Sequence, residues 1–197
     1  MRHTSLGVMR GIEALLDGRL DVVLGLASQA RASVSAELIR REPVLVAMST
    51  AHPLADQDTV AVAQLGDHEL LLPSDESGGE WNQFISLACA QAGITVRASS
   101  STVHGATVTA ELLRETDVLM PTLTWADPPV AVAFRPLVEP ELSFPWSLMT
   151  TALSAVDPRV AAFMEAARAI AHEQNWVCKS NSGELSGDWL AQADAPG

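Results

Sequence analysis

The stretch ALLDGRLDVVLG, residues 14–25, joins the end of an amphipathic helix to a short apolar strand. Upstream of it, apolar side chains recur at helical spacing and predict a helix over residues 6–17 with one buried face. Gly18 predicts the end of this helix, because glycine adopts the left-handed conformation that follows a helix at little cost. The continuous apolar run at 21–26 is typical of a strand buried on both faces of a sheet. The stretch therefore indicates one helix–turn–strand unit of an α/β fold.

The same alternation of strands and helices continues along the chain. We expect further helices over 80–92, over 106–113 and from Pro158 onward, the last with Asp157 as its N-cap. The remaining strands are expected at 42–49, 70–72, 94–98, 117–120, 130–134 and 144–152. Strands that alternate with helices of this length are typical of a mostly parallel sheet.

The sequence also contains a weak internal repeat. The segment LLRETDVL, residues 112–119, has the same helix end, tight turn and apolar strand as residues 15–24. Any turn from a helix into a buried strand has this pattern, and two similar α/β lobes would also produce it. Both interpretations stay open on the sequence alone.

Composition limits the class of protein. The 197 residues are 48% hydrophobic and 18% charged, with a net charge of −12, so a sizeable core is expected. Such acidity disfavours direct binding to nucleic acid by this chain. No apolar run approaches the roughly 18 residues that a membrane span needs, and the N-terminus does not resemble a secretion signal. We therefore expect a cytoplasmic protein without a membrane partner.

Three motifs in order resemble a known family. The stretch at 14–25 is followed by LIRREPVLVAMSTAHPLA at 38–55 and by VAVAQLGDHELLLP at 60–73. This series resembles the C-terminal effector-binding (substrate-binding) domain of LysR-type transcriptional regulators, over about residues 6–176. The resemblance implies a type II periplasmic-binding-protein-like α/β fold, in which two Rossmann-like lobes are joined by two crossover strands and a small effector sits between them.

On this chain the resemblance implies a first lobe from residues 1–49 plus 144–176 and a second lobe from 50–143. The crossovers are expected near 44–49 and 144–152, and residues 177–197 are expected to be a disordered tail. The family's N-terminal helix-turn-helix and the first β-α-β unit of its first lobe have no counterpart here. The chain thus resembles an N-terminally truncated domain with an incomplete first lobe, which predicts an exposed strand edge.

Two further features bear on function at this stage. Arg114-Glu-Thr116 stands where the family has a Gly-x-Gly turn, which puts close backbone packing at that turn in doubt. His52 belongs to the His-Pro-Leu motif, and we expect a structural role for it.

Candidate ligand-binding residues follow the expected strand ends. Hydroxyl groups and free N–H groups at helix N-termini favour anions, so a carboxylate-bearing effector is expected. Thr102 and His104 rank highest because they just precede the helix at 106–113. The full set of candidate ligand-binding residues is Thr102, His104, Ser49, Ser74 and Thr122. For any single Ser or Thr, the sequence favours ordinary helix capping over ligand binding.

No catalytic, metal or cofactor site is expected. His104 has no Cys or carboxylate at metal-ligand spacing, and Ser101-Thr-Val-His104 lacks the G-x-S-x-G turn of a nucleophilic serine. Cys89 and Cys178 form no CxxC pair, and no phosphate-binding glycine motif is present. The sequence thus gives no indication of an enzyme.

The sequence favours an effector-binding regulatory domain that carries no DNA-binding module. Its expected partners are a small-molecule effector and either a second copy of the chain or a full-length regulator. Two alternatives stay open: an enzyme on the same two-lobe scaffold that acts on a small anionic substrate, and a non-functional gene fragment.

Overall fold

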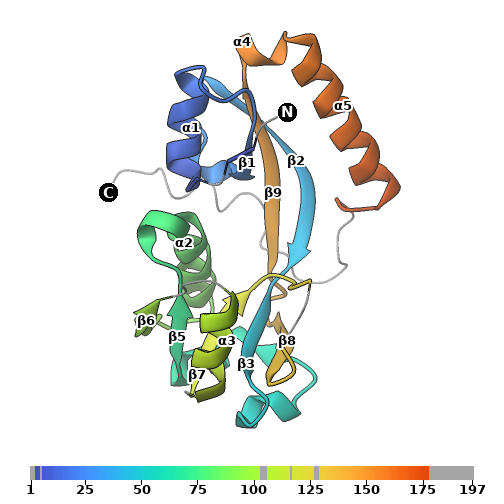
Figure 1. Ribbon diagram of the computed structural model, residues 1–197. Coiled ribbons are helices and arrows are strands. Elements are labelled where there is room, and N and C mark those ends of the chain that lie inside the picture. Colours follow the sequence, from blue (N-terminus) through green and yellow to red (C-terminus); the bar gives the residue numbers. More distant parts are fainter. Residues whose placement is uncertain (1–2, 5, 103–105, 116, 127–128, 178–197) are drawn as a thin grey trace. The chain divides into compact units, whose positions relative to one another are not determined.

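The computed structural model describes residues 3–4, 6–102, 106–115, 117–126 and 129–177 (Figure 1). These residues form two compact units. The first unit contains the described residues up to Glu42 and those from Phe144 onward, and the second unit contains Pro43–Ser143. None of the described helices is long and apolar enough to cross a membrane.

The first unit has a three-stranded sheet in the order β1-β9-β2. These strands are β1 (Val23–Leu26), β2 (Val34–Pro43) and β9 (Ser143–Thr151), and β1 pairs antiparallel with β9. The helices are α1 (Val8–Leu16), the short α4 (Ala152–Ala155) and α5 (Pro158–Glu173), with a 3-10 turn at Ala27–Gln29.

Each face of this small sheet has its own apolar cluster. Ile12 and Leu15 of α1 pack with Val23 and Met149 on one face. Val160 and Met164 of α5 pack with Leu148 on the other. Neighbouring residues of a strand point to opposite faces, so Met149 packs in the α1 cluster and Leu148 packs in the α5 cluster.

The second unit has a six-stranded sheet in the order β4-β8-β3-β7-β5-β6. The strands are β3 (Leu45–Ser49), β4 (Val60–Ala61), β5 (Glu69–Leu72), β6 (Ala98–Thr102), β7 (Val118–Thr122) and β8 (Val132–Val138). The helices are α2 (Asp75–Gln91) and α3 (Ala106–Glu115), with 3-10 segments at Pro53–Asp56 and Val62–Asp67.

Five of these six strands run in one direction. β5 is parallel to β6 and β7, and β4 is parallel to β8, whereas β3 is antiparallel to both β7 and β8. The expectation of a mostly parallel sheet therefore holds for this unit. One core cluster joins β3, β5 and β7 to Leu113 of α3.

Several helix ends are confirmed. Gly18 (φ +70°) and Gly93 (φ +75°) follow α1 and α2 in the left-handed conformation that glycine adopts at least cost. Asp157 caps α5 by accepting the Arg159 backbone N–H at 2.8 Å, and Pro158 is its first residue. Helical spacing predicts Val160, Met164 and Ile170 on the apolar face of α5. Val160 and Met164 are buried, but Ile170 is exposed and Ala171 is buried instead.

Other boundaries differ from the expectation. Residues 43–49 were assigned to the first lobe, yet β3 pairs between β7 and β8 and folds with the second unit. The polar residues at 27–36 predict a loop, yet β2 already begins at Val34, because this strand is only half-buried and has few apolar side chains. The strand expected at 94–98 lies instead at 98–102. The expected disordered tail, from residue 178 on, lies outside the described residues.

Candidate functional site

The candidate site lies at one edge of the second unit's sheet. Because β5, β6 and β7 are parallel, their carboxyl ends reach the same edge. The register pairs Leu72 with Thr102, so these two strand ends are adjacent. Ser74 follows β5 and Thr122 ends β7, so the fold brings three of the candidate residues to the same edge. Figure 1 shows α2 beginning where β5 ends.

The start of α2 presents a polar group at this edge. Ser74 is the N-cap residue, but its side chain makes no capping hydrogen bond. Asn82 lies further along the same helix. Its amide N–H groups donate to the Pro73 carbonyl oxygen at 2.9 Å and to Asp75 Oδ1 at 2.8 Å. Its own Oδ1 is buried and has no hydrogen-bond partner among the described residues. A buried acceptor of this kind suits a ligand that carries a hydroxyl or amino group.

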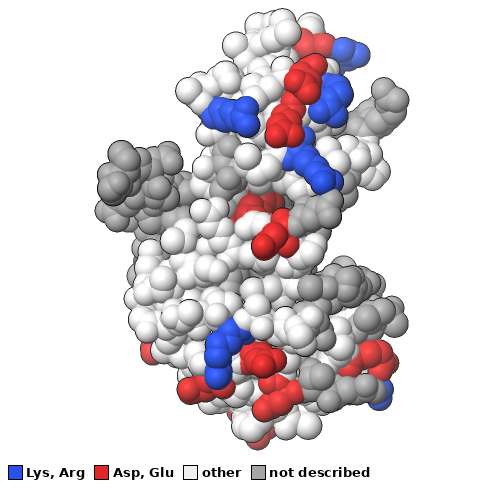
Figure 2. Space-filling model, turned by 90° about the vertical axis from the view of Figure 1, so that its left-hand side faces the viewer, with Lys and Arg blue, Asp and Glu red and all other residues white. Residues whose placement is uncertain are grey.

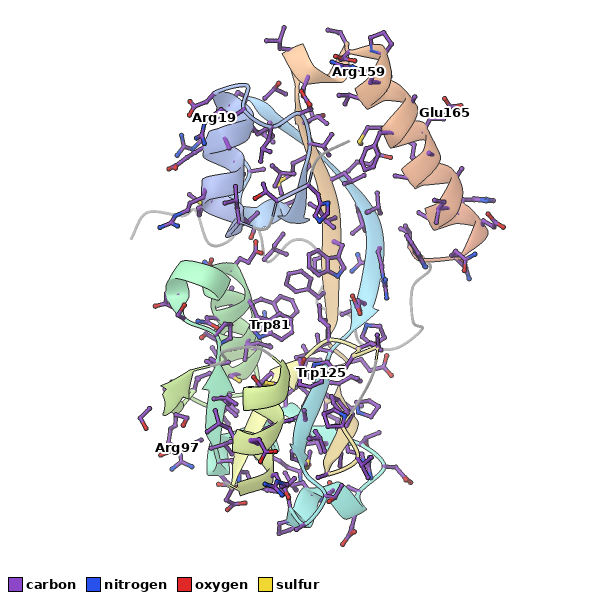
Figure 3. All side chains as sticks on the ribbon, in the orientation of Figure 1. Arg19, Trp81, Arg97, Trp125, Arg159 and Glu165 are labelled. Carbon is purple, nitrogen blue, oxygen red and sulfur yellow. The ribbon has the colours of Figure 1, made fainter. Side chains whose placement is uncertain are left out.

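Aromatic rings stand beside these polar groups. The Trp125 indole N–H donates to Thr122 Oγ1 at 2.9 Å, and its ring contacts Phe134 edge-on with centroids 5.5 Å apart. Trp81 of α2 is half-buried and stacks on Phe84 at 5.9 Å. Figure 3 labels Trp81 and Trp125, which both lie at this edge of the second unit. Flat apolar rings next to a few polar groups are typical of small-molecule sites.

Ser49 does not belong to this group. It was predicted as a strand-end residue like the others, but β3 runs antiparallel to its neighbours. The register pairs Leu45 with Thr122, which places the start of β3, not its end, at the candidate edge. Ser49 is therefore at the opposite edge, where its hydroxyl accepts the Ala51 backbone N–H at 3.2 Å. No feature of the sequence indicates the direction of β3.

The structure describes the two highest-ranked candidate ligand-binding residues, Thr102 and His104, only in part. Thr102 is the last residue of β6, and its side chain lies outside the described part of the structure. His104 lies outside the described residues altogether. Their assignment as ligand-binding residues remains a prediction.

The opposite edge of the sheet carries a histidine cluster. His52, His68 and Asp117 have ligand atoms within 4.8 Å of one another, and the two imidazole rings meet edge-on at 4.8 Å. His52 Nδ1 accepts the Leu54 backbone N–H at 3.1 Å, so its proton is on Nε2. Asp117 Oδ1 lies 3.0 Å from Nε2, but the two atoms do not have the geometry of a hydrogen bond. A metal at Nε2 would need the lone pair that this tautomer lacks, so the structure favours the structural role expected for His52.

The described cysteine is not suited to nucleophilic catalysis. Cys89 is 1% exposed within α2, and burial raises the pKa of its thiol to about 11. The thiolate is the reactive form, so this side chain acts as a core residue.

Surface charge is mixed on the face drawn in Figure 2. Acidic side chains lie among the arginines there, and that face presents no continuous basic surface of the kind that binds a nucleic-acid backbone.

The comparisons with known proteins agree with this fold. The family model for the LysR substrate binding domain matches residues 4–171. The chain belongs to this family. Its fold is accordingly the type II periplasmic-binding-protein-like α/β fold that the three motifs implied. A search of curated proteins gave no match.

Solved structures of LysR regulators share the fold at low sequence identity. The effector binding domain of QuiR in complex with shikimate is 17% identical, with a TM-score of 0.73 over 85% of this chain and 79% of that one. The BenM effector binding domain with its effector benzoate is 20% identical, with a TM-score of 0.73 over 92% and 82%. Full-length BenM is 18% identical, with a TM-score of 0.76. The match covers 90% of this chain but only 59% of full-length BenM.

Sequence reasoning missed Asn82 and undervalued Trp81. The helical spacing of Trp81 and Phe84 predicts core positions for both, yet the structure leaves Trp81 half-buried at the candidate edge. Asn82 carries no motif. Its position one residue after Trp81 places it on the first turn of the helix expected at 80–92, but its unpartnered oxygen is visible only in three dimensions.

Proposed function

We propose that this chain is the effector-binding part of a LysR-type regulator and binds a small carboxylate at the edge formed by the ends of β5, β6 and β7. The observation that carries the proposal is the convergence of three parallel strand ends with the first turns of α2. Asn82 Oδ1, buried there without a partner, would accept a hydrogen bond from a hydroxyl group of the ligand and would not contact its carboxylate. The further candidate effector-binding residues are Thr122, Ser74, Thr102 and His104.

The proposed role is binding and not catalysis. The described histidine–carboxylate cluster lies at the opposite edge, and the described thiol has a raised pKa. Within residues 3–177 the chain passes between its two units only at Glu42–Pro43 and Ser143–Phe144. A ligand that favours one arrangement of the units would shift their equilibrium, and a second copy or a full-length regulator would transmit that shift.

Titration with shikimate and benzoate, the compounds bound to QuiR and BenM, tests the proposal. We expect saturable binding by calorimetry, accompanied by a change in tryptophan fluorescence that Trp125→Phe reduces. Asn82→Ala and Thr122→Val should each weaken binding about tenfold, the effect of one lost hydrogen bond to a charged or polar ligand.

The matched control is Gln91→Ala, at the exposed far end of the same helix, which should bind as the wild type does. If a wider panel of small carboxylates also fails to bind, or if binding is unchanged in both edge variants, the proposal is wrong.

A further inference from the structure

The first unit contains a groove of its own, between the α5 face of its sheet and the helices α4 and α5. Its volume is about 410 Å³, within the range of roughly 300–1,000 Å³ that small-molecule sites occupy. The groove is lined by residues of β2, β9, α4 and α5 alone, and all of them belong to the first unit.

Small side chains leave the groove open. Ala36 of β2, Ala155 of α4 and Ala161 of α5 line its walls, where a larger residue would fill the space. The floor is apolar, because Leu148 and Met164 are 4% and 8% exposed. A compact ring or branched aliphatic group would bury its surface on this floor.

A preoriented arginine stands at the rim. Arg168 Nε donates to Glu37 Oε1 at 2.6 Å and Arg168 Nη2 donates to Glu37 Oε2 at 2.8 Å. This side-on pairing uses two of the five N–H groups of the guanidinium. Within the described residues the Nη1 group has no bonding partner, so it can donate to a ligand without breaking the ion pair. Glu37 therefore fixes the orientation of the guanidinium plane but occupies only its Nε and Nη2 groups.

Two hydroxyl groups also line the groove. Thr150 is 5% exposed as a residue, and its hydroxyl is not among the buried polar atoms of the described residues that lack a partner. Ser35 adds a second hydroxyl at the exposed wall. Each of these groups can donate to or accept from a ligand in the groove.

From these contacts we infer that the groove is a second binding site, separate from the edge of the second unit, for a compact monocarboxylate. Its carboxylate accepts from Arg168 Nη1, its apolar body rests on Leu148 and Met164, and a ring hydroxyl or carboxylate oxygen reaches Thr150. The Glu37 carboxylate repels an anion, and Arg168 lies in contact with solvent. Binding is therefore expected to be weak and to decrease with salt.

Methyl NMR of the whole chain, labelled at methionine and titrated with benzoate as the probe, tests this site. We expect the Met164 methyl resonance to shift saturably. Arg168→Ala should weaken the binding that Met164 reports about tenfold or more, the loss of a charge-assisted hydrogen bond, and Ala161→Leu should abolish it by filling the groove.

Arg159→Ala is the matched control, because Arg159 lies on the same helix, is paired with Asp157 and does not line the groove. It should leave the Met164 titration unchanged. Asn82→Ala should also leave it unchanged, while Met120 of β7 reports on the second unit, so this site and the proposed edge site can fail independently. The inference would be overturned if the wild-type Met164 resonance does not shift saturably. It would also be overturned if Arg168→Ala and Ala161→Leu titrate as the wild type does.

Discussion

The imidazole Nε2 of His52 lies 3.0 Å from Oδ1 of Asp117, although the two residues are separated by three strands of sequence. His52 is 5% exposed, and burial is the main cause that lowers the pKa of its imidazole below the ordinary 6.5. Asp117 acts in the opposite sense and His68 adds to the lowering. The neutral ring accepts the Leu54 N–H through Nδ1 and so holds the turn that follows β3.

Burial of the neutral His52 ring predicts acid sensitivity of the fold. The folded state takes up a proton at His52 less readily than the unfolded chain does, so stability is constant above pH 6.5 and falls as the pH drops below it. His52→Asn should flatten this part of the pH profile, because the amide oxygen can replace Nδ1 as the acceptor but does not titrate. Urea denaturation across this range measures it, with His172→Asn on exposed α5 as the control. Equal profiles for the wild type and His52→Asn would contradict the prediction.

Gly78 predicts a steric effect within α2. Its backbone departs from helical geometry (φ −147°, ψ 26°), and a Cβ added there would lie 2.4 Å from Cγ of Pro73. Gly78→Ala should therefore destabilise the protein by about 1–3 kcal/mol through overpacking. At Gly79 an added Cβ meets nothing within 4 Å, so Gly79→Ala should be neutral or stabilising by roughly 0.5–1 kcal/mol. Chemical denaturation of the pair checks the contrast, and equal losses would refute it.

Glu42 and Trp146 form a partly buried hydrogen bond between the two long strands of the first unit. The Trp146 indole N–H donates to Glu42 Oε2 at 2.9 Å, and Arg40 lies 3.3 Å from the other carboxylate oxygen. Glu42→Ala leaves the indole N–H without its acceptor and should cost about 1–3 kcal/mol. Glu42→Gln keeps an acceptor and should cost less. The measurement is the urea midpoint followed by tryptophan emission, and it fails if the two variants are equally destabilised.

The sequence predicted those features that depend on local chemistry. The ends of α1 at Gly18 and of α5 at Asp157–Pro158 followed from backbone preferences that act within a few residues. The family motifs then implied the two-unit fold. The direction of β3 depends instead on how distant strands meet, which is why Ser49 was placed at the wrong edge. Asn82 was missed for a related reason, since an unpartnered oxygen depends on what every neighbour contributes.

The edge of β1 carries the last prediction, which concerns self-association. β1 pairs with β9 on one side, and its other edge has no strand partner among the described residues. Leu24 faces Leu148 across this pair, so both side chains lie on the α5 face of the sheet. α5 leaves Leu148 4% exposed but Leu24 53% exposed. An open strand edge next to exposed apolar surface favours pairing with another chain. We therefore expect concentration-dependent association in sedimentation velocity.

Leu24→Lys should reduce that association, because a charge on an edge strand opposes strand addition. The matched control is Leu153→Lys, on α4, where an 82% exposed leucine lies away from any strand edge; it should associate as the wild type does. A wild-type chain that stays monomeric and soluble at every concentration would contradict the prediction, and equal effects of the two lysine variants would assign the association to general hydrophobicity instead of to the β1 edge.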